Sequence, residues 1–258
     1  MKRRQFLTTL GLAGAGLTLA PVLLRATQGE EAKAEHGQAE HSKTEHSKGK
    51  RWGMAIDTKK LTPEIMEKCI AACNRAHNIP HIPNKKEIKW VWMETFHHLF
   101  PGQMYDKHYS SFSEDKSLAL CNHCEHPPCV RVCPTQATFK RDDGIVMMDF
   151  HRCIGCRYCM AACPFGSRSF NFYDPRKFLK TENPEFPTRT KGVVEKCLFC
   201  YERLDEGKLP YCVEVAEGAI YFGDLNDPNS EIRKVLAKRF ALTRKPELGT
   251  VPCVYYLI

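Results

Sequence analysis

The sequence lacks the features by which proteins usually bind nucleic acid. No long basic run with interleaved aromatic residues occurs in its 258 residues. The net charge of +8 is partly local, because half of it comes from four cations within residues 1–26, where no acidic residue occurs. These cations are Lys2, Arg3, Arg4 and Arg25. The remaining chain has the charge balance of an ordinary protein surface, so we expect no nucleic-acid partner.

The sequence also lacks the motifs of a stand-alone enzyme. Neither a phosphate-binding loop nor a recognisable Ser/His/Asp set is present. Cysteine, in contrast, is abundant: the chain has 14, far more than a reduced cytoplasmic enzyme normally carries, at spacings too regular for a secreted disulfide scaffold. A chain of this length forms one large domain or two small ones around an apolar core. We therefore expect a non-catalytic protein whose cysteines bind metal, with no small-molecule substrate.

Two cysteine runs lie between residues 121 and 164, and a proline follows the last cysteine of each. The second run has the spacing of bacterial ferredoxins with cubane iron–sulfur clusters, and the first has two extra residues before its third cysteine. Two intervening residues let three thiolates curl around one cluster, while the fourth cysteine reaches the neighbouring cluster. The runs therefore predict two clusters, the first completed by Cys163 and the second by Cys133. The runs are Cys121, Cys124, Cys129, Cys133 and Cys153, Cys156, Cys159, Cys163.

Other uses of these cysteines remain open as alternatives. Zinc also binds four thiolates, but its sites usually consist of separated Cys-x-x-Cys pairs, and a third cysteine in step is unusual. A purely structural cluster or zinc protein can be distinguished by absorbance, because zinc–thiolate is colourless and a cubane cluster is brown. His123, His126 and His151 lie near the runs. We expect them at the surface or behind the cysteine ligands rather than as ligands.

Residues 1–26 predict a twin-arginine export signal. The paired Arg3 and Arg4 are followed by a weakly apolar stretch with several glycines that runs to about Leu24. A plain transmembrane helix is the alternative, which the glycines and Pro21 weaken, and an uncleaved signal that acts as an anchor stays open. The twin-arginine route exports folded proteins, which suits a cofactor inserted before export. We therefore expect the mature protein on the periplasmic (exoplasmic) face of the membrane.

Residues 27–50 predict a solvated linker. The segment repeats Glu-His every five residues and contains no apolar side chain larger than alanine. A five-residue period matches no helical face, so no packed helix is expected. Weak metal capture by His36, His41 and His46 stays open.

The folded part is expected to begin near residue 51. Thr62 and Pro63 are the cap and first turn of a helix that carries Cys69 and Cys73 to about His77. Further expected elements are strands at 51–57, 87–96 and 218–224, a helix at 230–239 and an extended tail at 248–256.

The segment between the two cysteine runs predicts a hairpin over residues 137–150, with its turn at 142–144, as a two-cluster ferredoxin fold requires. Residues 168–190 predict a loop-rich excursion because they contain several prolines. Trp90 and Trp92 are spaced for one face of a strand, and we expect them in the core or in a subunit contact.

A further cysteine set follows the central runs. Cys197 and Cys200 are separated by two residues, and Cys212 comes after eleven more. Three residues beyond Cys212, where a fourth cysteine would stand, the sequence has Ala216.

The whole pattern resembles the four-cluster iron–sulfur subunits that partner molybdopterin reductases and NrfD-type quinone-linked membrane proteins. The resemblance covers nearly everything after residue 50. It is carried by residues 52–57, the two central runs, residues 196–212 and residues 249–256. In that family the outer cysteine motifs interlock as the inner ones do. The resemblance implies an α+β fold of two interlocked two-cluster ferredoxin-like units, built from short helices, hairpins and long loops.

The departures from the family pattern all affect one cluster. Of the first motif only Cys69 and Cys73 remain, with Leu61 and its neighbours where the first two cysteines would fall, and Ala216 replaces the last cysteine of the fourth motif. The resemblance therefore implies three complete [4Fe-4S] sets and one degenerate site, with Cys69 and Cys253 unused. The first set is Cys121, Cys124, Cys129 and Cys163; the second is Cys153, Cys156, Cys159 and Cys133; the third is Cys197, Cys200, Cys212 and Cys73.

By the resemblance, the missing cluster is the one nearest a molybdenum catalytic subunit. Its loss implies the DsrO-type subunit of the sulfite-reduction-associated transmembrane complex, which works with an NrfD-like polytopic quinone-interacting membrane subunit and a multihaem cytochrome c. The alternative is the electron-transfer subunit of a molybdopterin reductase such as polysulfide or tetrathionate reductase. The expected organisation is an outer lobe of residues 51–118 and 180–258 with one cluster, and an inner lobe of residues 119–179 with two.

Overall fold

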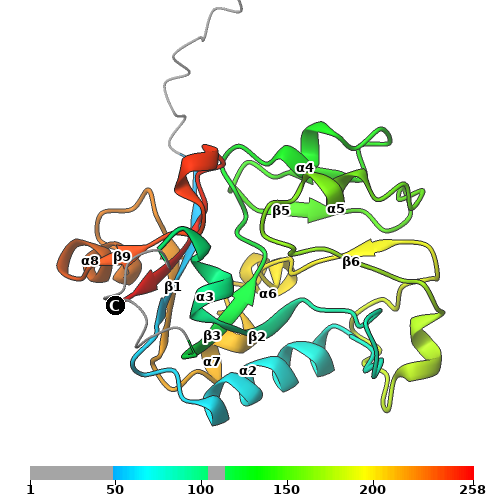
Figure 1. Cartoon of the computed structure of the whole chain (residues 1–258), viewed down its shortest axis with the longest axis horizontal. Helices are drawn as coiled ribbons and strands as arrows, with labels where there is room; N and C mark the ends of the chain where they lie inside the picture. The colour runs from blue at the N-terminus through cyan, green and yellow to red at the C-terminus, as the bar shows by residue number, and fades with distance from the viewer. Residues whose placement is uncertain (1–48, 104–113) are drawn as a thin grey trace, which may run out of the picture. The chain divides into compact units, whose positions relative to one another are not determined.

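The computed structural model describes residues 49–103 and 114–258 (Figure 1). The predicted export signal and almost all of the predicted linker lie outside the described residues. Within the described part of the chain, no helix combines the length and apolar character needed to cross a membrane.

The main sheet joins the beginning of the described chain to its end. Its four strands have the order β8-β1-β10-β9. Strand β1 (Trp52–Asp57) pairs in parallel with β10 (Val254–Leu257) and antiparallel with β8 (Ile220–Asp224), and β9 (Ala241–Leu242) completes the edge. The strands predicted at 51–57 and 218–224 are therefore confirmed.

Helix α2 (Pro63–Ala76) begins and ends as its sequence predicts. The Thr62 side chain accepts a hydrogen bond from the backbone N–H of Ile65, and Pro63 occupies the first turn. Cys69 and Cys73 are one turn apart and are both buried on the inner face of the helix. Helix α7 (Tyr211–Glu214) packs against α2, which brings a distant cysteine segment beside Cys73.

A two-stranded antiparallel sheet of β2 (Val91–Thr95) and β3 (Lys116–Leu120) lies next to α2 (Figure 1). The strand predicted over 87–96 is too long at both ends. Before it, the Lys89 backbone N–H donates to the Ser169 hydroxyl, and after it Phe96 begins the short helix α3 (Phe96–Leu99). Strand β3 was not predicted.

The region between residues 121 and 170 contains the predicted hairpin and two short helices. Strands β4 (Thr138–Lys140) and β5 (Val146–Met148) are antiparallel, as expected from the turn sequence between them. Helices α4 (Pro128–Arg131) and α5 (Tyr158–Ala162) lie side by side (Figure 1), and each carries a cysteine of one central run. This pairing of helices brings the two cysteine runs together.

The remaining elements are short. Helix α8 (Glu231–Lys238) covers β8 and β1 and is capped by the Ser230 side chain, so the helix predicted at 230–239 is confirmed. The tail predicted as extended over 248–256 forms a strand only from Val254. The others are η1 (Pro101–Gln103), β6 (Ser169–Phe170) paired with β7 (Val194–Glu195), η3 (Pro175–Phe178), α6 (Tyr201–Asp205) and η4 (Pro246–Leu248).

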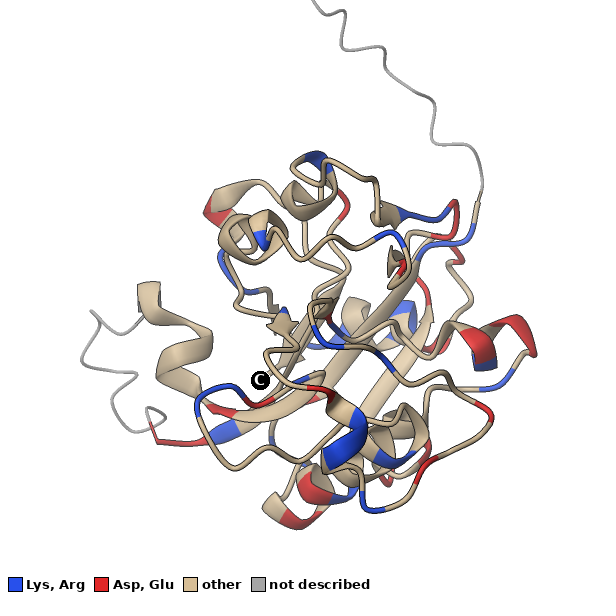
Figure 2. Ribbon diagram, turned by 90° about the vertical axis from the view of Figure 1, so that its right-hand side faces the viewer, with Lys and Arg blue, Asp and Glu red and all other residues tan. Residues whose placement is uncertain are grey.

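This mixture of small helices and small sheets is an α+β fold, as predicted. Basic and acidic residues are interspersed along the ribbon in the view of Figure 2. Some of these charges join distant segments: Arg141 pairs with Asp205 at 2.6 Å, and Arg239 pairs with the buried carboxylate of Asp57.

Candidate metal centre

The four cysteines of the third set line one cavity. Cys73 comes from α2, Cys197 and Cys200 come from the loop before α6, and Cys212 comes from α7. All four thiols are buried. Apolar side chains, including Met54, Trp90 and Leu198, complete the lining. Segments far apart in the sequence therefore present four sulfur atoms to a single enclosed space.

The electrostatics of this cavity favour metal binding. Burial raises the pKa of the Cys73 thiol well above its usual value, and Cys197, Cys200 and Cys212 raise it further. Burial likewise raises the pKa of Cys197 to about 12. Four thiolates cannot share such a space without a cation, and a bound metal deprotonates its thiol ligands and supplies that charge. The residues present therefore fit a metal cluster.

The first set also converges. Cys121, Cys124 and Cys129 are buried, and Cys163 is half-buried. Burial raises the pKa of Cys124 strongly, and the other three thiols of the set raise it further. Asn122, beside Cys121, is also buried, and neither atom of its side-chain amide has a hydrogen-bond partner among the described residues. An unpaired buried amide at this point is consistent with a polar group, such as a cluster sulfide, being bound there.

The second set lies nearest the surface. Burial is the main cause that raises the pKa of Cys159, and the charge of Cys153 raises it further. Cys133 is half-buried, and although burial opposes it, hydrogen bonds from backbone N–H groups lower the pKa of its thiol, which favours the thiolate. Cys156 is exposed. The structure thus brings together all four members of the first and third sets and, from the second, Cys153 with Cys159.

The three sets are arranged in series. The charge of Cys121, in the first set, raises the pKa of Cys197, in the third. The charge of Cys129, in the first set, raises the pKa of Cys159, in the second. The first set therefore lies between the other two. The series runs from a fully buried end, the third set, to an end with an exposed cysteine, the second.

The two cysteines outside the sets have other contacts. The Cys69 thiol donates a hydrogen bond to the backbone carbonyl of Cys212 at 3.2 Å, and burial raises its pKa to about 11. The Cys253 sulfur accepts a hydrogen bond from the Arg51 guanidinium at 3.4 Å. Ala216, at the position of the absent fourth-motif cysteine, is completely buried.

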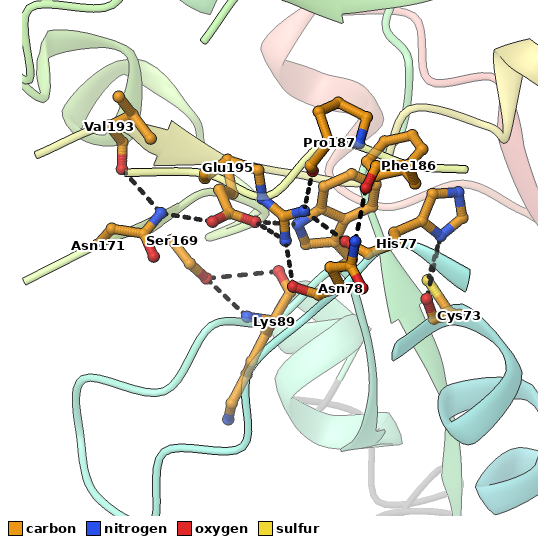
Figure 3. A network of polar contacts seen from close by, with 12 residues as sticks. Cys73, His77, Asn78, Lys89, Ser169, Asn171, Phe186, Pro187, Val193 and Glu195 are labelled. Carbon is orange, nitrogen blue, oxygen red and sulfur yellow. Dashed lines mark hydrogen bonds and ion pairs between the residues drawn. The ribbon is translucent and has the colours of Figure 1, made fainter. Parts of the chain in front are cut away.

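His77 is a residue of the cavity that the sequence interpretation did not single out. It lines the third-set cavity one turn after Cys73, and its Nδ1 lies 3.0 Å from the Cys73 carbonyl oxygen and 3.7 Å from the Cys73 sulfur (Figure 3). Its Nε2 lies 2.9 Å from a carboxylate oxygen of Glu202. Cys200 also lies within reach of His77 and Glu202. The i to i+4 spacing from Cys73 was the signal available in the sequence.

The three histidines near the central runs divide into two kinds. His123 is completely buried, stacks on Phe199 at 3.7 Å, and its Nδ1 accepts a hydrogen bond from the Val146 backbone N–H. Burial lowers its pKa well below the usual value, so this ring is neutral. His126 and His151 are exposed.

Comparison with known proteins agrees with this geometry. The sequence model of the 4Fe-4S dicluster domain family matches residues 117–175. The Hdr-like menaquinol oxidoreductase iron-sulfur subunit 1 of Archaeoglobus fulgidus is 41% identical, with 99% of this chain and 97% of the relative aligned. The chain belongs to the iron–sulfur electron-transfer subunits of reductase complexes.

Two further relatives support the assignment of this chain, called the iron–sulfur subunit below, to that family. A tetrathionate reductase subunit of Salmonella typhimurium is 34% identical, over 99% of this chain and 87% of the relative. A polysulfide reductase subunit of Wolinella succinogenes is 35% identical, over 80% of this chain and 93% of the relative. These relatives are electron-transfer rather than catalytic subunits, so the iron–sulfur subunit is not itself an enzyme, and its cysteines carry [4Fe-4S] clusters.

Proposed function

We propose that the iron–sulfur subunit carries electrons through three [4Fe-4S] clusters, each bound by one of the three cysteine sets. The observation that carries this proposal is the convergence of Cys73 with Cys197, Cys200 and Cys212 around one buried cavity. Four thiolates are the ligand set of such clusters. The fourth site of the family is degenerate here, since it retains Cys69 alone and Cys69 is hydrogen-bonded to a backbone carbonyl.

Electrons pass along the series from one end to the other. The second set includes the exposed Cys156, and its neighbours Ile154 and Tyr158 are 67% and 63% exposed. Exposed apolar side chains beside a cluster are typical of a surface that a partner protein covers. Electrons therefore enter or leave the subunit at the second cluster.

The proposed partners are an NrfD-like polytopic quinone-interacting membrane subunit and a multihaem cytochrome c, in sulfur or sulfite respiration. The menaquinol named in the Archaeoglobus fulgidus relative supports the link to quinone. Arg3 and Arg4 support export by the twin-arginine route to the periplasmic face. The loss of one cluster supports the DsrO-type branch and the absence of a molybdenum subunit. In this arrangement an outer lobe (51–118 and 180–258) interlocks with an inner lobe (119–179).

A molybdopterin reductase such as polysulfide or tetrathionate reductase is the second candidate, because relatives bearing those names align over most of this chain. Affinity isolation of the exported subunit from its own membranes distinguishes the two. The DsrO-type proposal expects a polytopic membrane subunit and haem. A stoichiometric molybdenum protein in the isolate would establish the second candidate instead.

The number of clusters is tested by a matched pair of cysteine variants. The wild-type protein, purified without oxygen, should contain about twelve irons per chain by the four-cysteine rule. Cys73→Ser should lower this to about eight, or convert one cluster to a three-iron form. Cys69→Ser, one helical turn away, and Cys253→Ser should leave iron and sulfide unchanged. Loss of a whole cluster from the Cys69→Ser variant would contradict the assignment of the degenerate site.

A further inference from the structure

Lys196 is a fully buried cation between the third and first sets. Its side chain has no measurable exposure, and its ammonium donates hydrogen bonds to the backbone carbonyls of Val146 and, at 2.8 Å, of Cys197. Burial lowers the pKa of Lys196, and the nearby thiols of Cys121, Cys197 and Cys129 oppose this. Cys121 belongs to the first set and Cys197 to the third. The ammonium therefore lies where the two sets approach each other.

Arg168 has the corresponding place between the first and second sets. It is 5% exposed, and its guanidinium donates to the Thr138 hydroxyl at 2.8 Å and lies 3.8 Å from the Met148 sulfur. Burial raises the pKa of the Cys129 and Cys159 thiols, and the charge of Arg168 is the largest influence opposing this at both. Cys129 belongs to the first set and Cys159 to the second, so the charge of one guanidinium acts on a thiol of each set.

Neither cation has a carboxylate partner. In residues 49–103 and 114–258, no ion pair joins Lys196 or Arg168 to an Asp or Glu side chain. The two cations are also close enough that each charge disfavours the other. Burying a charge without an opposite charge is strongly unfavourable. The nearest available negative charge is that of the cysteine thiolates.

The buried pair Arg189 and Glu195 gives the contrast within the same molecule. Both side chains are completely buried, and they form an ion pair at 2.7 Å. There the protein supplies a carboxylate to a buried guanidinium. Near Lys196 and Arg168 the nearby groups that can carry a negative charge are cysteines of the three sets instead.

We propose that Lys196 and Arg168 are fixed positive charges in the two gaps of the cluster series, and that each raises the reduction potentials of the two clusters it separates. The inference rests on the three ligand sets of the proposed function. A cluster with four thiolate ligands carries a net negative charge, and reduction adds one more. A cation beside it favours the reduced form, because opposite charges attract more strongly in a buried, low-dielectric place.

Because each cation lies between two clusters, it affects the reduction potentials of both. Each transfer moves one electron from a reduced cluster, which is thereby oxidised, to its oxidised neighbour, which is thereby reduced, and no proton moves. A charge located between the two clusters stabilises the electron on either side of the gap. It therefore raises the potentials of both clusters by similar amounts and leaves the difference between them nearly unchanged.

The test is an EPR-monitored redox titration of the anaerobically purified subunit, reduced with dithionite. Arg168→Met removes the charge, Arg168→Lys keeps it, and Lys196→Met removes the other charge. The exposed Arg176, which pairs with Asp174, provides the control Arg176→Met. Iron analysis of the wild-type protein is a separate measurement: a content other than about twelve irons overturns the proposed function itself, whatever the potentials.

The expected result is a specific pattern of shifts. Arg168→Met lowers the midpoint potentials of the first and second clusters and leaves the third unchanged, while Lys196→Met lowers those of the third and first. Arg168→Lys and Arg176→Met leave all potentials near those of the wild type. Selective loss of a flanking cluster from Arg168→Met but not from Arg168→Lys also supports the proposal. Unchanged potentials, an equal shift of all three clusters, or identical behaviour of the two Arg168 variants overturns it.

Discussion

The ion pair between Arg189 and Glu195 lies at the carboxyl end of α2, beside the third-set cavity. Arg189 donates to the backbone carbonyls of His77 and, at 2.8 Å, of Asn78, directly after α2 ends. Glu195 accepts a hydrogen bond from the Trp90 indole at 3.0 Å. The pair therefore fixes the end of the helix that carries Cys73, and His77 with it.

Replacing Arg189 with leucine tests how much this pair stabilises the protein. The change leaves the completely buried Glu195 carboxylate without its cation, which costs about 3–5 kcal/mol for such pairs. For a chain of this size that loss lowers the thermal midpoint by roughly 6–20 °C. The double variant Arg189→Leu with Glu195→Gln should recover much of the loss, because glutamine keeps an acceptor oxygen for Trp90 but carries no charge.

The assay is loss of the brown cluster absorbance during heating at one fixed scan rate, since unfolding with cluster loss is irreversible. Arg189→Leu should also lose the third cluster first, which EPR spectra of partly heated samples detect. Arg176→Leu, at the exposed pair with Asp174, should not change the midpoint. A midpoint for Arg189→Leu close to that of the wild type, or additive losses in the double variant, would refute the reasoning.

Two further predictions concern the second cluster and export. Gly155 has φ +71°, and a Cβ there would overlap the Gly192 carbonyl oxygen and press on Phe170. Gly155→Ala should therefore lower the iron content by about four per chain through loss of the second cluster, measured against the wild type; full iron content would contradict this. Changing Arg3 and Arg4 to lysine should leave the protein in the cytoplasm, as fractionation would detect, and normal export of that variant would exclude the twin-arginine route.

The parts of the fold that the sequence predicts well are those set by neighbouring residues. The cap at Thr62, the proline at the first turn and the hairpin turn at 142–144 act locally, and each is found in the structure. The cysteine spacings are also local, which is why the sets of the central runs could be proposed from spacing alone. Assigning Cys73 to the third set needed the family resemblance, because it is far from Cys197 in the sequence.

The features that sequence reasoning missed depend on contacts between distant segments. Strand β3 forms only because it pairs with β2, and the segment before it has no clear period. Lys196 and Arg168 look like ordinary surface cations in the sequence, and only the packing of the three sets around them makes them buried. His77 becomes a cavity residue because Glu202 and Trp90 from other segments meet it there.

The parallel pairing of β1 with β10 has a consequence for the order in which the protein matures during translation. Cys73 leaves the ribosome long before Cys212 and Val254; at ordinary synthesis rates the interval to β10 is roughly 10–40 s. The first and second sets lie within residues 121–163 and can receive iron during that time. The third set cannot close, and β1 keeps an unpaired edge until its last partner strand arrives. We therefore expect the third set, at the buried end of the series, to receive its cluster last, once Cys212 has been synthesised.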